Sequence, residues 1–325
     1  MREYKVMIVG DLHLSSKNYG NHINYAQETL DIFRKITAIA EENKVTHIIG
    51  LGDFTMAQIE SLRYRAFIDE ELEKQNELTN GNRYEIRGNH DYSSQHITDY
   101  EYYKTFRGML RCPDYIDIGN TRIHLVSYGD ESRKLEMGSG YNMICAHNYL
   151  RFDNTKMADF YGTSYVCLDD KYKWYGVDAI FCGHIHEENE FTGTMYSDAE
   201  HTESKEVAVY YPGCPSRPAY RKNLDKYGHV VIVDIGTDEA PTIDIQDFEL
   251  LPIGMAFAST EETMKDVVNV MKEKDEVINI EDITENLCKY NNKFGDIENE
   301  IDALDMFSVE AREKAKSLYR AALNA

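Results

Sequence analysis

The chain has 325 residues and a hydrophobic fraction of 42%, which suits a globular protein of one large domain with an appendage, or of two modest domains. Its formal net charge of −22 argues against a stand-alone DNA-binding protein, because such proteins usually carry a basic surface. No stretch approaches the roughly 18 consecutive apolar residues of a membrane span. The six scattered cysteines form no C-x-x-C pair, so we expect free thiols in a cytoplasmic protein without a signal peptide.

The first part of the chain alternates between two kinds of pattern. Residues 4–9, 45–51 and 83–87 are short runs typical of strands. Between them, residues 24–42 and 61–78 carry apolar side chains three and four positions apart, which predicts two amphipathic helices.

After residue 120 strands predominate, and we expect 207–211 and 229–235 to pair with each other. Strand–helix alternation followed by strands predicts an α/β sandwich, with a mixed sheet or two packed sheets and helices outside. We assign residues 1–250 to this domain and 251–325 to a small helical or α/β appendage. The predicted strands of the second part are 123–127, 141–146, 177–182, 207–211, 229–235 and 242–250.

Side chains that bind metal ions follow the ends of five predicted strands. Ligands collect at the carboxyl ends of strands in open α/β sheets, and residues two apart in extended chain point the same way. The absence of cysteine favours manganese, iron or a mixed pair over a structural zinc. There are more donors than one ion needs, so we expect two ions about 3.5–4 Å apart that share one carboxylate. The stretches are Asp11 and His13; Asp53; Asn89, His90 and Asp91; His147; and His184 and His186.

This ordered set resembles the pattern of the calcineurin-like metallophosphoesterases, which is D-x-H, G-D, G-N-H-[D/E], H and G-H-x-H. The resemblance covers about residues 4–250 and implies that family's sandwich of two mixed sheets flanked by helices. It also implies that Asp53 bridges two metals, one held with Asp11, His13 and His186 and the other with Asn89, His147 and His184.

The resemblance further implies that His90 is not a ligand and instead stabilises or protonates the leaving oxygen. Two divalent cations, most simply manganese with iron, magnesium and zinc as alternatives, would offset the charge of a phosphodiester and activate a water molecule. Asp91 would either orient the His90 imidazole or cap the turn, and the sequence leaves both open.

Within that family the chain is most similar to the Mre11/SbcD nucleases, including phage recombination exonucleases. The similarity rests on G-H-I-H at 183–186, on Y-Y-P-G-C-P-S-R at 210–217 and on the strand at 226–235. It implies a DNA exo- and endonuclease subunit that works with a Rad50/SbcC-type ATPase, commonly as a homodimer. Met56 stands where that group often has a second histidine, which puts processive duplex exonuclease activity in doubt, and Cys214 stands where serine is usual.

Several other residues carry weaker hypotheses. Arg217 and Arg221, with Lys222, would contact a nucleic-acid backbone or lie on an ordinary solvated loop. Arg87 would contact phosphate or brace the turn, and Tyr100, Tyr102 and Tyr103 would stack on bases or simply pack.

The last part of the chain predicts helices at 264–274 and 308–323. The apolar stripe of the second would pack onto the domain or dock the ATPase's coiled coil.

Three functions remain open from the sequence. The first is a metal-dependent DNA nuclease subunit. The second is a phosphodiesterase or phosphatase for a small substrate such as a cyclic nucleotide, which the net charge of −22 suits better. The third is a non-catalytic scaffold, against which the complete ligand set counts.

Overall fold

The structure is a computed structural model of the chain, and it describes residues 4–18, 22–151, 166–167, 174–198, 200–217, 227–236, 240–251 and 256. The chain divides into two units, Met1–Pro252 and Ile253–Ala325. All described residues except Ala256 belong to the first unit, and the account below concerns that unit. The two predicted C-terminal helices lie outside the described residues.

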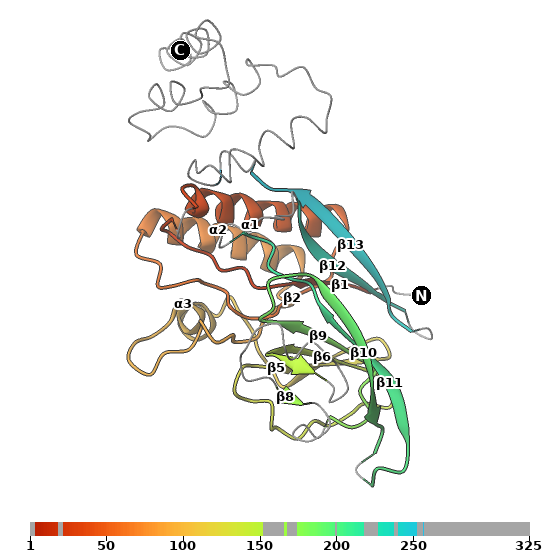
Figure 1. Cartoon of the computed structure of the whole chain (residues 1–325). Coiled ribbons are helices and arrows are strands. Elements are labelled where there is room, and N and C mark those ends of the chain that lie inside the picture. Colours follow the sequence, from red (N-terminus) through yellow and green to blue (C-terminus); the bar gives the residue numbers. More distant parts are fainter. Residues whose placement is uncertain are drawn as a thin grey trace, which may run out of the picture. The chain divides into compact units, whose positions relative to one another are not determined.

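One sheet has five strands in the order β13-β12-β1-β2-β3 (Figure 1). β1, β2 and β3 run parallel, whereas β12 is antiparallel to β1 and β13 to β12. The parallel strands are the three predicted in the first part of the chain, so all three deliver their carboxyl ends to one edge. The bounds are β1 Tyr4–Val9, β2 His47–Gly50, β3 Arg83–Glu85, β12 Tyr227–Ile235 and β13 Thr242–Glu249.

The second sheet has six strands in the order β10-β11-β9-β6-β5-β4. Its four central strands run parallel, and the edge strands β4 and β10 are antiparallel to their neighbours. A two-stranded pair, β7 (Leu150–Arg151) with β8 (Val166–Cys167), completes the described strands. The bounds are β4 Tyr115–Ile118, β5 Thr121–Val126, β6 Tyr141–His147, β9 Ala179–Gly183, β10 Asn189–Tyr196 and β11 Ser204–Tyr211.

Both predicted amphipathic helices are present, as α1 (Tyr25–Glu42) and α2 (Leu62–Leu78). The N-terminus of α2 is capped by Ser61, whose side chain accepts a hydrogen bond from Tyr64 N at 3.3 Å. Leu62, the first residue of α2, is 83% exposed, whereas Phe67, Ile68 and Leu72 of the same helix are buried. A short helix α3 (Asp99–Glu101) continues into the π-helical turn η1 (Tyr102–Phe106).

Three apolar layers hold the unit together. The first lies between the two sheets and is built by side chains such as Ile8, Leu125 and Phe181. In the second, α1 and α2 cover the outer face of the five-stranded sheet. The outer face of the six-stranded sheet packs against Leu135 and Trp174 rather than against a helix of the described residues. The expected two packed mixed sheets are therefore confirmed, with the described helices gathered on one side.

One predicted pairing is wrong. β11 and β12 do not pair, since β11 lies between β9 and β10 in one sheet and β12 between β1 and β13 in the other. Both strands are apolar and lie close in sequence, but the chain crosses from one sheet to the other between them. The sequence also gave no signal for β10, because an edge strand has few buried side chains and its residues are mostly polar.

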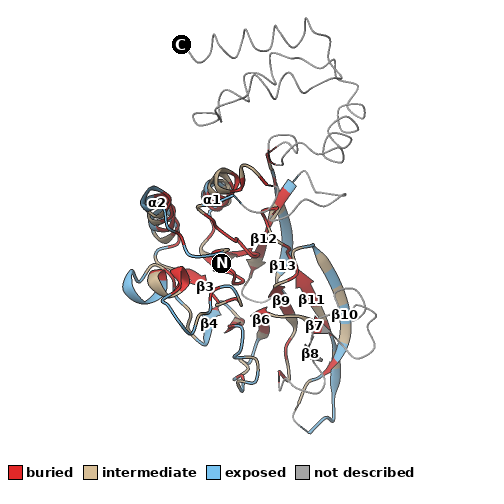
Figure 2. Ribbon diagram, turned by 60° about the vertical axis from the view of Figure 1, so that its left-hand side comes forward, coloured by how far each residue is buried: buried red, intermediate tan, exposed pale blue. Residues whose placement is uncertain are grey.

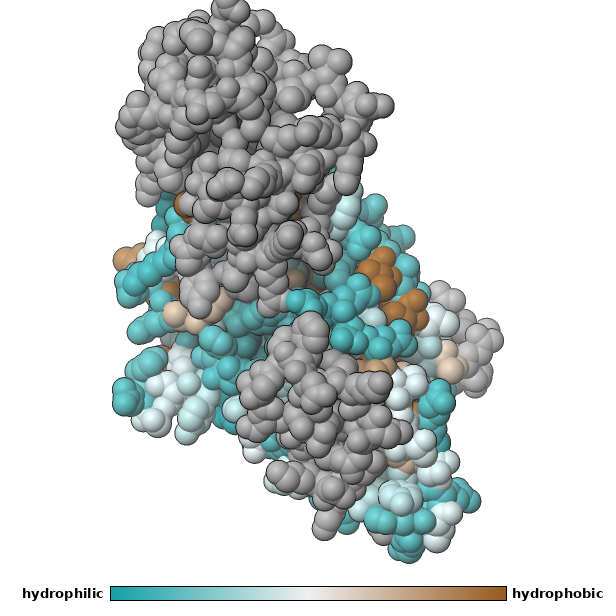
Figure 3. Space-filling model, in the orientation of Figure 1, coloured by the Kyte–Doolittle hydropathy of each residue, from teal (hydrophilic) through white to brown (hydrophobic). Residues whose placement is uncertain are grey.

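Exposed residues are frequent along the edge strands β10 and β13. Figure 2 shows buried residues in the central strands and exposed ones along β10 and β13. In Figure 3 hydrophilic residues dominate the visible face, with exposed apolar atoms over β13, where Ile243 and Ile245 are 52% and 42% exposed. No helix of the described ranges is long and apolar enough to cross a membrane.

The loop after β1 passes very close to the loop after β11. A Cβ atom added to Gly10 would lie 1.7 Å from the carbonyl oxygen of Gly213, which belongs to the backbone and cannot rotate away. We predict that Gly10→Ala lowers the free energy of unfolding by about 1–3 kcal/mol or more, through overpacking. Chemical denaturation of the metal-free protein measures this.

The matched control is Gly236→Ala, where an added Cβ meets nothing within 4 Å. It should change the free energy of unfolding by less than about 0.5 kcal/mol. Equal effects of the two substitutions would show that the two loops do not approach as described.

Candidate metal centre

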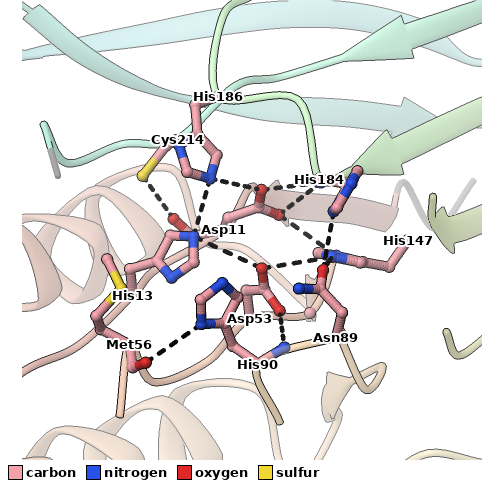
Figure 4. A network of polar contacts seen from close by, with 12 residues as sticks. Asp11, His13, Asp53, Met56, Asn89, His90, His147, His184, His186 and Cys214 are labelled. Atoms are coloured by element: carbon pink, nitrogen blue, oxygen red, sulfur yellow. Dashed lines mark hydrogen bonds and ion pairs between the residues drawn. The ribbon is translucent and has the colours of Figure 1, made fainter. Parts of the chain in front are cut away.

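The two sheets meet at the site, and each supplies part of it. Asp11 and His13 follow β1, Asp53 follows β2, and Asn89 follows β3 in the five-stranded sheet. His147 ends β6, and His184 and His186 follow β9 in the six-stranded sheet. All seven predicted metal-binding side chains converge here, at the carboxyl ends of parallel strands from both sheets (Figure 4).

Three of these residues have backbone angles that non-glycine residues rarely adopt. The φ angles are 47° for His13, 50° for Asp53 and 88° for His184. Such left-handed conformations cost free energy and persist only where the surroundings enforce them, which is common at functional sites. The backbone therefore turns sharply just after each strand and directs the side chain into the site.

Asp11, His13 and His186 form the first group of donors. The Nε2 atoms of His13 and His186 lie 3.0 Å apart, and Asp11 Oδ2 is 3.8 Å from His186 Nε2. Asp11 also accepts two hydrogen bonds from the backbone N–H of His184, at 2.8 and 3.1 Å, which fix its carboxylate. Asp11 and His13 are fully buried, so the group is shielded from water on its inner side.

Asn89, His147 and His184 form the second group. The Asn89 Oδ1 atom lies 3.0 Å from His147 Nε2 and 2.8 Å from His184 Nδ1. His147 Nδ1 donates to the carbonyl oxygen of Leu51 at 2.7 Å, so its Nε2 faces the site. A backbone acceptor on the outer ring nitrogen is the usual way to orient a metal-binding histidine.

Asp53 lies between the two groups. Its Oδ2 atom is 3.6 Å from His13 Nε2 and 3.4 Å from His147 Nε2, so one oxygen faces donors from both sheets. The other oxygen, Oδ1, accepts a hydrogen bond from the backbone N–H of His90 at 2.8 Å. This geometry suits a carboxylate shared between two cations.

The residues fit two divalent cations. The ligand atoms of Asp11, His13 and His186 all lie within 4.8 Å of one another, and so do those of Asp53, His147 and His184. The Nε2 atoms of His13 and His186 face each other at 3.0 Å, so one cation could accept the lone pairs of both nitrogens. The Nε2 atom of His13 thus faces donors of both groups, His186 at 3.0 Å and Asp53 at 3.6 Å.

The pKa shifts of the buried donors indicate which protons a bound cation would displace. Burial raises the pKa of Asp11 despite the nearby His147. Burial alone would lower the pKa of His147, but the carboxylates of Asp11 and Asp53 outweigh it and raise that pKa to about 9. Asp53 is also buried, yet its interactions with His147 and His13 hold its pKa below the ordinary value. Without a cation, His147 would therefore be protonated at neutral pH, at a position where a metal would bind.

His90 lies at the exposed side of the site. Its Nδ1 atom is 3.3 Å from the carbonyl oxygen of Met56, and its ring meets that of His13 edge-on at 5.0 Å. Its ring nitrogen also lies within 4.8 Å of ligand atoms of His13 and Asp53. His90 thus borders the donors while remaining accessible to substrate. Met56, at the position of the expected accessory histidine, contributes only its backbone here.

Asp91 makes no described hydrogen bond to the His90 ring, which the hypothesis that it orients this imidazole required. Its buried carboxylate accepts hydrogen bonds from the backbone N–H groups of Gly88 at 2.9 Å and Phe54 at 3.1 Å. Burial, followed by repulsion from Asp53, raises the pKa of Asp91 to about 7. The bond from Gly88 closes the turn after β3, which agrees with the turn-capping hypothesis, and the bond from Phe54 joins this turn to the loop after β2.

A buried ion pair that no sequence motif pointed to supports the site. Glu85 Oε2 pairs with Arg83 Nη2 at 2.6 Å, and Glu85 Oε1 accepts from Gly52 N at 3.2 Å, directly before Asp53. A Cβ at Gly50 would lie 2.1 Å from this carboxylate, so glycine makes room for it. The sequence signal was present, since Arg83 and Glu85 are two apart in a strand and share one face.

A second support lies behind Asp11 and His13. The Cys214 thiol donates to the carbonyl oxygen of Asp11 at 2.9 Å, and the Tyr25 hydroxyl to that of His13 at 3.0 Å. Ser216 Oγ lies 3.2 Å from each of the two supporting groups. A thiol in place of the usual serine thus still fills the donor role, and burial raises its pKa to about 12, so it stays a thiol.

Arg217 does not lie on a solvated loop. It is 5% exposed, and its guanidinium pairs with Glu28 and donates to the carbonyl oxygen of Leu251 at 2.5 Å. A buried guanidinium paired with a carboxylate is poorly placed for phosphate, so this substrate contact is corrected to a structural role. Arg221 lies outside the described residues. Tyr100 and Tyr103 are buried in the core and are not base-stacking residues.

Comparison with known proteins identifies a family and similar solved structures. Residues 4–188 match the model of the calcineurin-like phosphoesterase family. A dimetal phosphatase from Danio rerio is 10% identical, with 78% of this chain and 99% of that chain covered and a TM-score of 0.45. A Vps29 single mutant from Entamoeba histolytica is 12% identical, with 75% and 99% covered and a TM-score of 0.32. No curated protein matches. Because the family model spans more than half of the 325 residues, the chain belongs to the calcineurin-like phosphoesterase family.

Proposed function

We propose that the protein is a two-metal phosphodiesterase. The observation that carries this proposal is that Asp53 Oδ2 faces imidazoles from both sheets, at 3.6 and 3.4 Å. One cation would be held by Asp11, His13, Asp53 and His186. The other would be held by the same Asp53 with a set from β3, β6 and β9: Asn89, His147 and His184. Manganese is our first choice, because the donors mix carboxylate, amide and imidazole without thiolate; iron, magnesium and zinc are the alternatives.

Different residues of the chain would hold the cations and transfer the proton. Bound divalent ions supply charge neutralisation and a more acidic water molecule. Asp11 and His147 are fixed by the backbone atoms of His184 and Leu51, so the donors need little rearrangement. His90, exposed beside them, is suited to hold a proton at a ring nitrogen and transfer it to the leaving oxygen.

For the substrate, we propose DNA, with the protein acting as an exo- or endonuclease subunit in repair or recombination. The support is the sequence resemblance to the Mre11/SbcD nucleases at 183–186 and 210–217. That resemblance also motivates a Rad50/SbcC-type ATPase as partner, a homodimer and a cytoplasmic location. A partner of this kind would supply the basic surface that a chain of net charge −22 lacks.

A small phosphodiester such as a cyclic nucleotide is the second candidate. The same net charge of −22 favours it, because a small substrate carries few phosphates and needs no extended basic surface. In the described part of the chain, the Arg217 guanidinium is already paired with Glu28.

One experiment separates the candidates. We predict that purified protein with manganese cleaves linear DNA, and that Asp53→Asn lowers turnover by more than about 100-fold, since a shared charged ligand becomes neutral. Duplex DNA, single-stranded DNA and a cyclic nucleotide are assayed in parallel, with metal-free protein as control. Turnover of the cyclic nucleotide alone would reject the nuclease assignment. Full manganese-dependent turnover by Asp53→Asn would reject the metal centre.

His90 is tested separately from the metal ligands. We predict that His90→Ala lowers kcat by about 10²–10⁴-fold, the range expected for loss of a general acid, while manganese binding is retained. His96→Ala is the matched control, because His96 is also exposed and lies outside the site, and it should keep full activity. Loss of manganese binding in His90→Ala would make His90 a ligand instead.

Metal binding should release protons. His147 has a pKa raised to about 9, so it is protonated at pH 7 without metal, and binding removes that proton. We therefore predict that manganese affinity rises with pH up to about 9. Calorimetric titrations in two buffers of different ionisation enthalpy measure the proton count. The pKa of His147, about 9, sets the pH range of this test. A manganese affinity that does not change between pH 6 and 9 would contradict the assignment of His147 as a metal ligand.

A further inference from the structure

The two groups of donors are oriented in different ways. In the second group, the outer ring nitrogen of His147 donates to the carbonyl oxygen of Leu51 at 2.7 Å, so the ring itself is held. In the first group, the Nδ1 atom of His13 is buried and has no hydrogen-bond partner among the described residues. Metal-binding histidines usually have such a partner, so the orientation of the His13 ring depends more heavily on its backbone.

The backbone of His13 is held from two sides. Its φ angle of 47° is left-handed, a conformation that persists only where the surroundings enforce it. The His13 N–H donates to the carbonyl oxygen of Asp53 at 2.8 Å, which joins the loops that follow β1 and β2. The His13 carbonyl oxygen accepts a hydrogen bond from the hydroxyl group of Tyr25, the first residue of α1, at 3.0 Å.

The Tyr25 hydroxyl is the donor on which the His13 carbonyl group relies. His13 is fully buried, and no other described residue donates a hydrogen bond to its carbonyl oxygen. Ser216 Oγ, 3.2 Å from the phenol oxygen, can donate to it, so the single phenol proton is available for His13. Burial raises the pKa of Tyr25, which keeps this proton in place. A buried carbonyl group without a donor is costly, so loss of the hydroxyl would favour another backbone conformation at His13.

A second buried tyrosine contacts the same loop but no metal-binding residue. The Tyr64 hydroxyl accepts a hydrogen bond from the Ser15 N–H at 3.1 Å and lies 2.7 Å from Thr29 Oγ1. Tyr64 is 5% exposed, so its phenol group is buried beside the loop after β1, as that of Tyr25 is. Of these two hydroxyl groups, only that of Tyr25 holds the backbone of a donor.

We propose that Tyr25 is a positioning residue for the metal position formed by the first group of donors. Its hydroxyl holds the left-handed backbone of His13, and this backbone directs the ring Nε2 atom toward the cation. The second group does not contain His13 and keeps its own support, the bond from His147 to Leu51. The inference rests on the proposed two-metal function and adds that different supports set the affinities of the two positions.

Manganese binding by the Tyr25→Phe variant tests this proposal, because the substitution removes only the hydroxyl group. Calorimetry gives the number and affinity of the bound ions, and electron paramagnetic resonance distinguishes a coupled manganese pair from a single ion. We expect one position to bind manganese about 10–100-fold more weakly, the range typical for loss of a residue that supports a metal ligand, while the other keeps its affinity. At intermediate manganese concentrations the spectrum should change from that of a pair to that of a single ion.

A double-mutant cycle identifies the weakened position. In the His147→Ala background, Tyr25→Phe should still weaken the remaining ion by about 10–100-fold. In the His13→Ala background it should weaken the remaining ion no further, because the ring that it positions is gone. The opposite pattern would overturn the proposal, since Tyr25 would then act on the second position.

Tyr64→Phe is the matched control, because it removes a buried hydroxyl beside the same loop. It should leave both manganese affinities unchanged. Ser216→Ala, which removes only the group behind the phenol, should give a smaller loss at the same position as Tyr25→Phe. Unchanged affinities in Tyr25→Phe, equal weakening of both positions, or an equal loss in Tyr64→Phe would each overturn the proposal.

The same measurements separate this proposal from the proposed function. An unaltered protein that binds no pair of manganese ions would reject the two-metal function, and Tyr25 would have no position to support. If the unaltered protein binds the pair and hydrolyses bis(4-nitrophenyl) phosphate, but Tyr25→Phe binds both ions as tightly, the function stands and only the role of Tyr25 is rejected.

Discussion

The Asp53 carboxylate is the contact on which the rest of the site depends. It leaves the five-stranded sheet after β2, and its Oδ2 faces His13 at 3.6 Å and His147, from the other sheet, at 3.4 Å. A buried carboxylate is costly unless it is paired. Here the pairing partners come from both sheets, so the cost of burying Asp53 is offset only when the sandwich is assembled.

Hydrogen bonds to the residues before and after Asp53 also fix its position. Glu85 accepts a hydrogen bond from Gly52 N, and Asp91 accepts from Phe54 N, so the residues on both sides of Asp53 are fixed by buried carboxylates. The consequence is a dense group of acids and imidazoles with raised and lowered pKa values. The donors around Asp53 would suit divalent cations, since each bound ion would replace protons and satisfy several donors at once.

The net charge of the chain bears on which substrate it binds. A net charge of −22 weakens the case for an extended DNA footprint on this chain alone. Recognition of a phosphate through two cations would not depend on a basic surface. The nuclease and small-substrate proposals therefore share one physical demand, a phosphodiester at the two cations, and differ in how much more of the substrate must be held.

The sequence by itself determined the donors and the strand ends that carry them. Asp11, Asp53 and His147 follow apolar runs, and strand periodicity is a local property that a sequence displays directly. Only the tertiary structure decided that Asp91 binds backbone N–H groups, that Arg217 is buried against Glu28, and that β11 and β12 lie in different sheets. These facts depend on contacts between residues far apart in the chain, and such contacts are set by sheet order and packing, which no local pattern encodes.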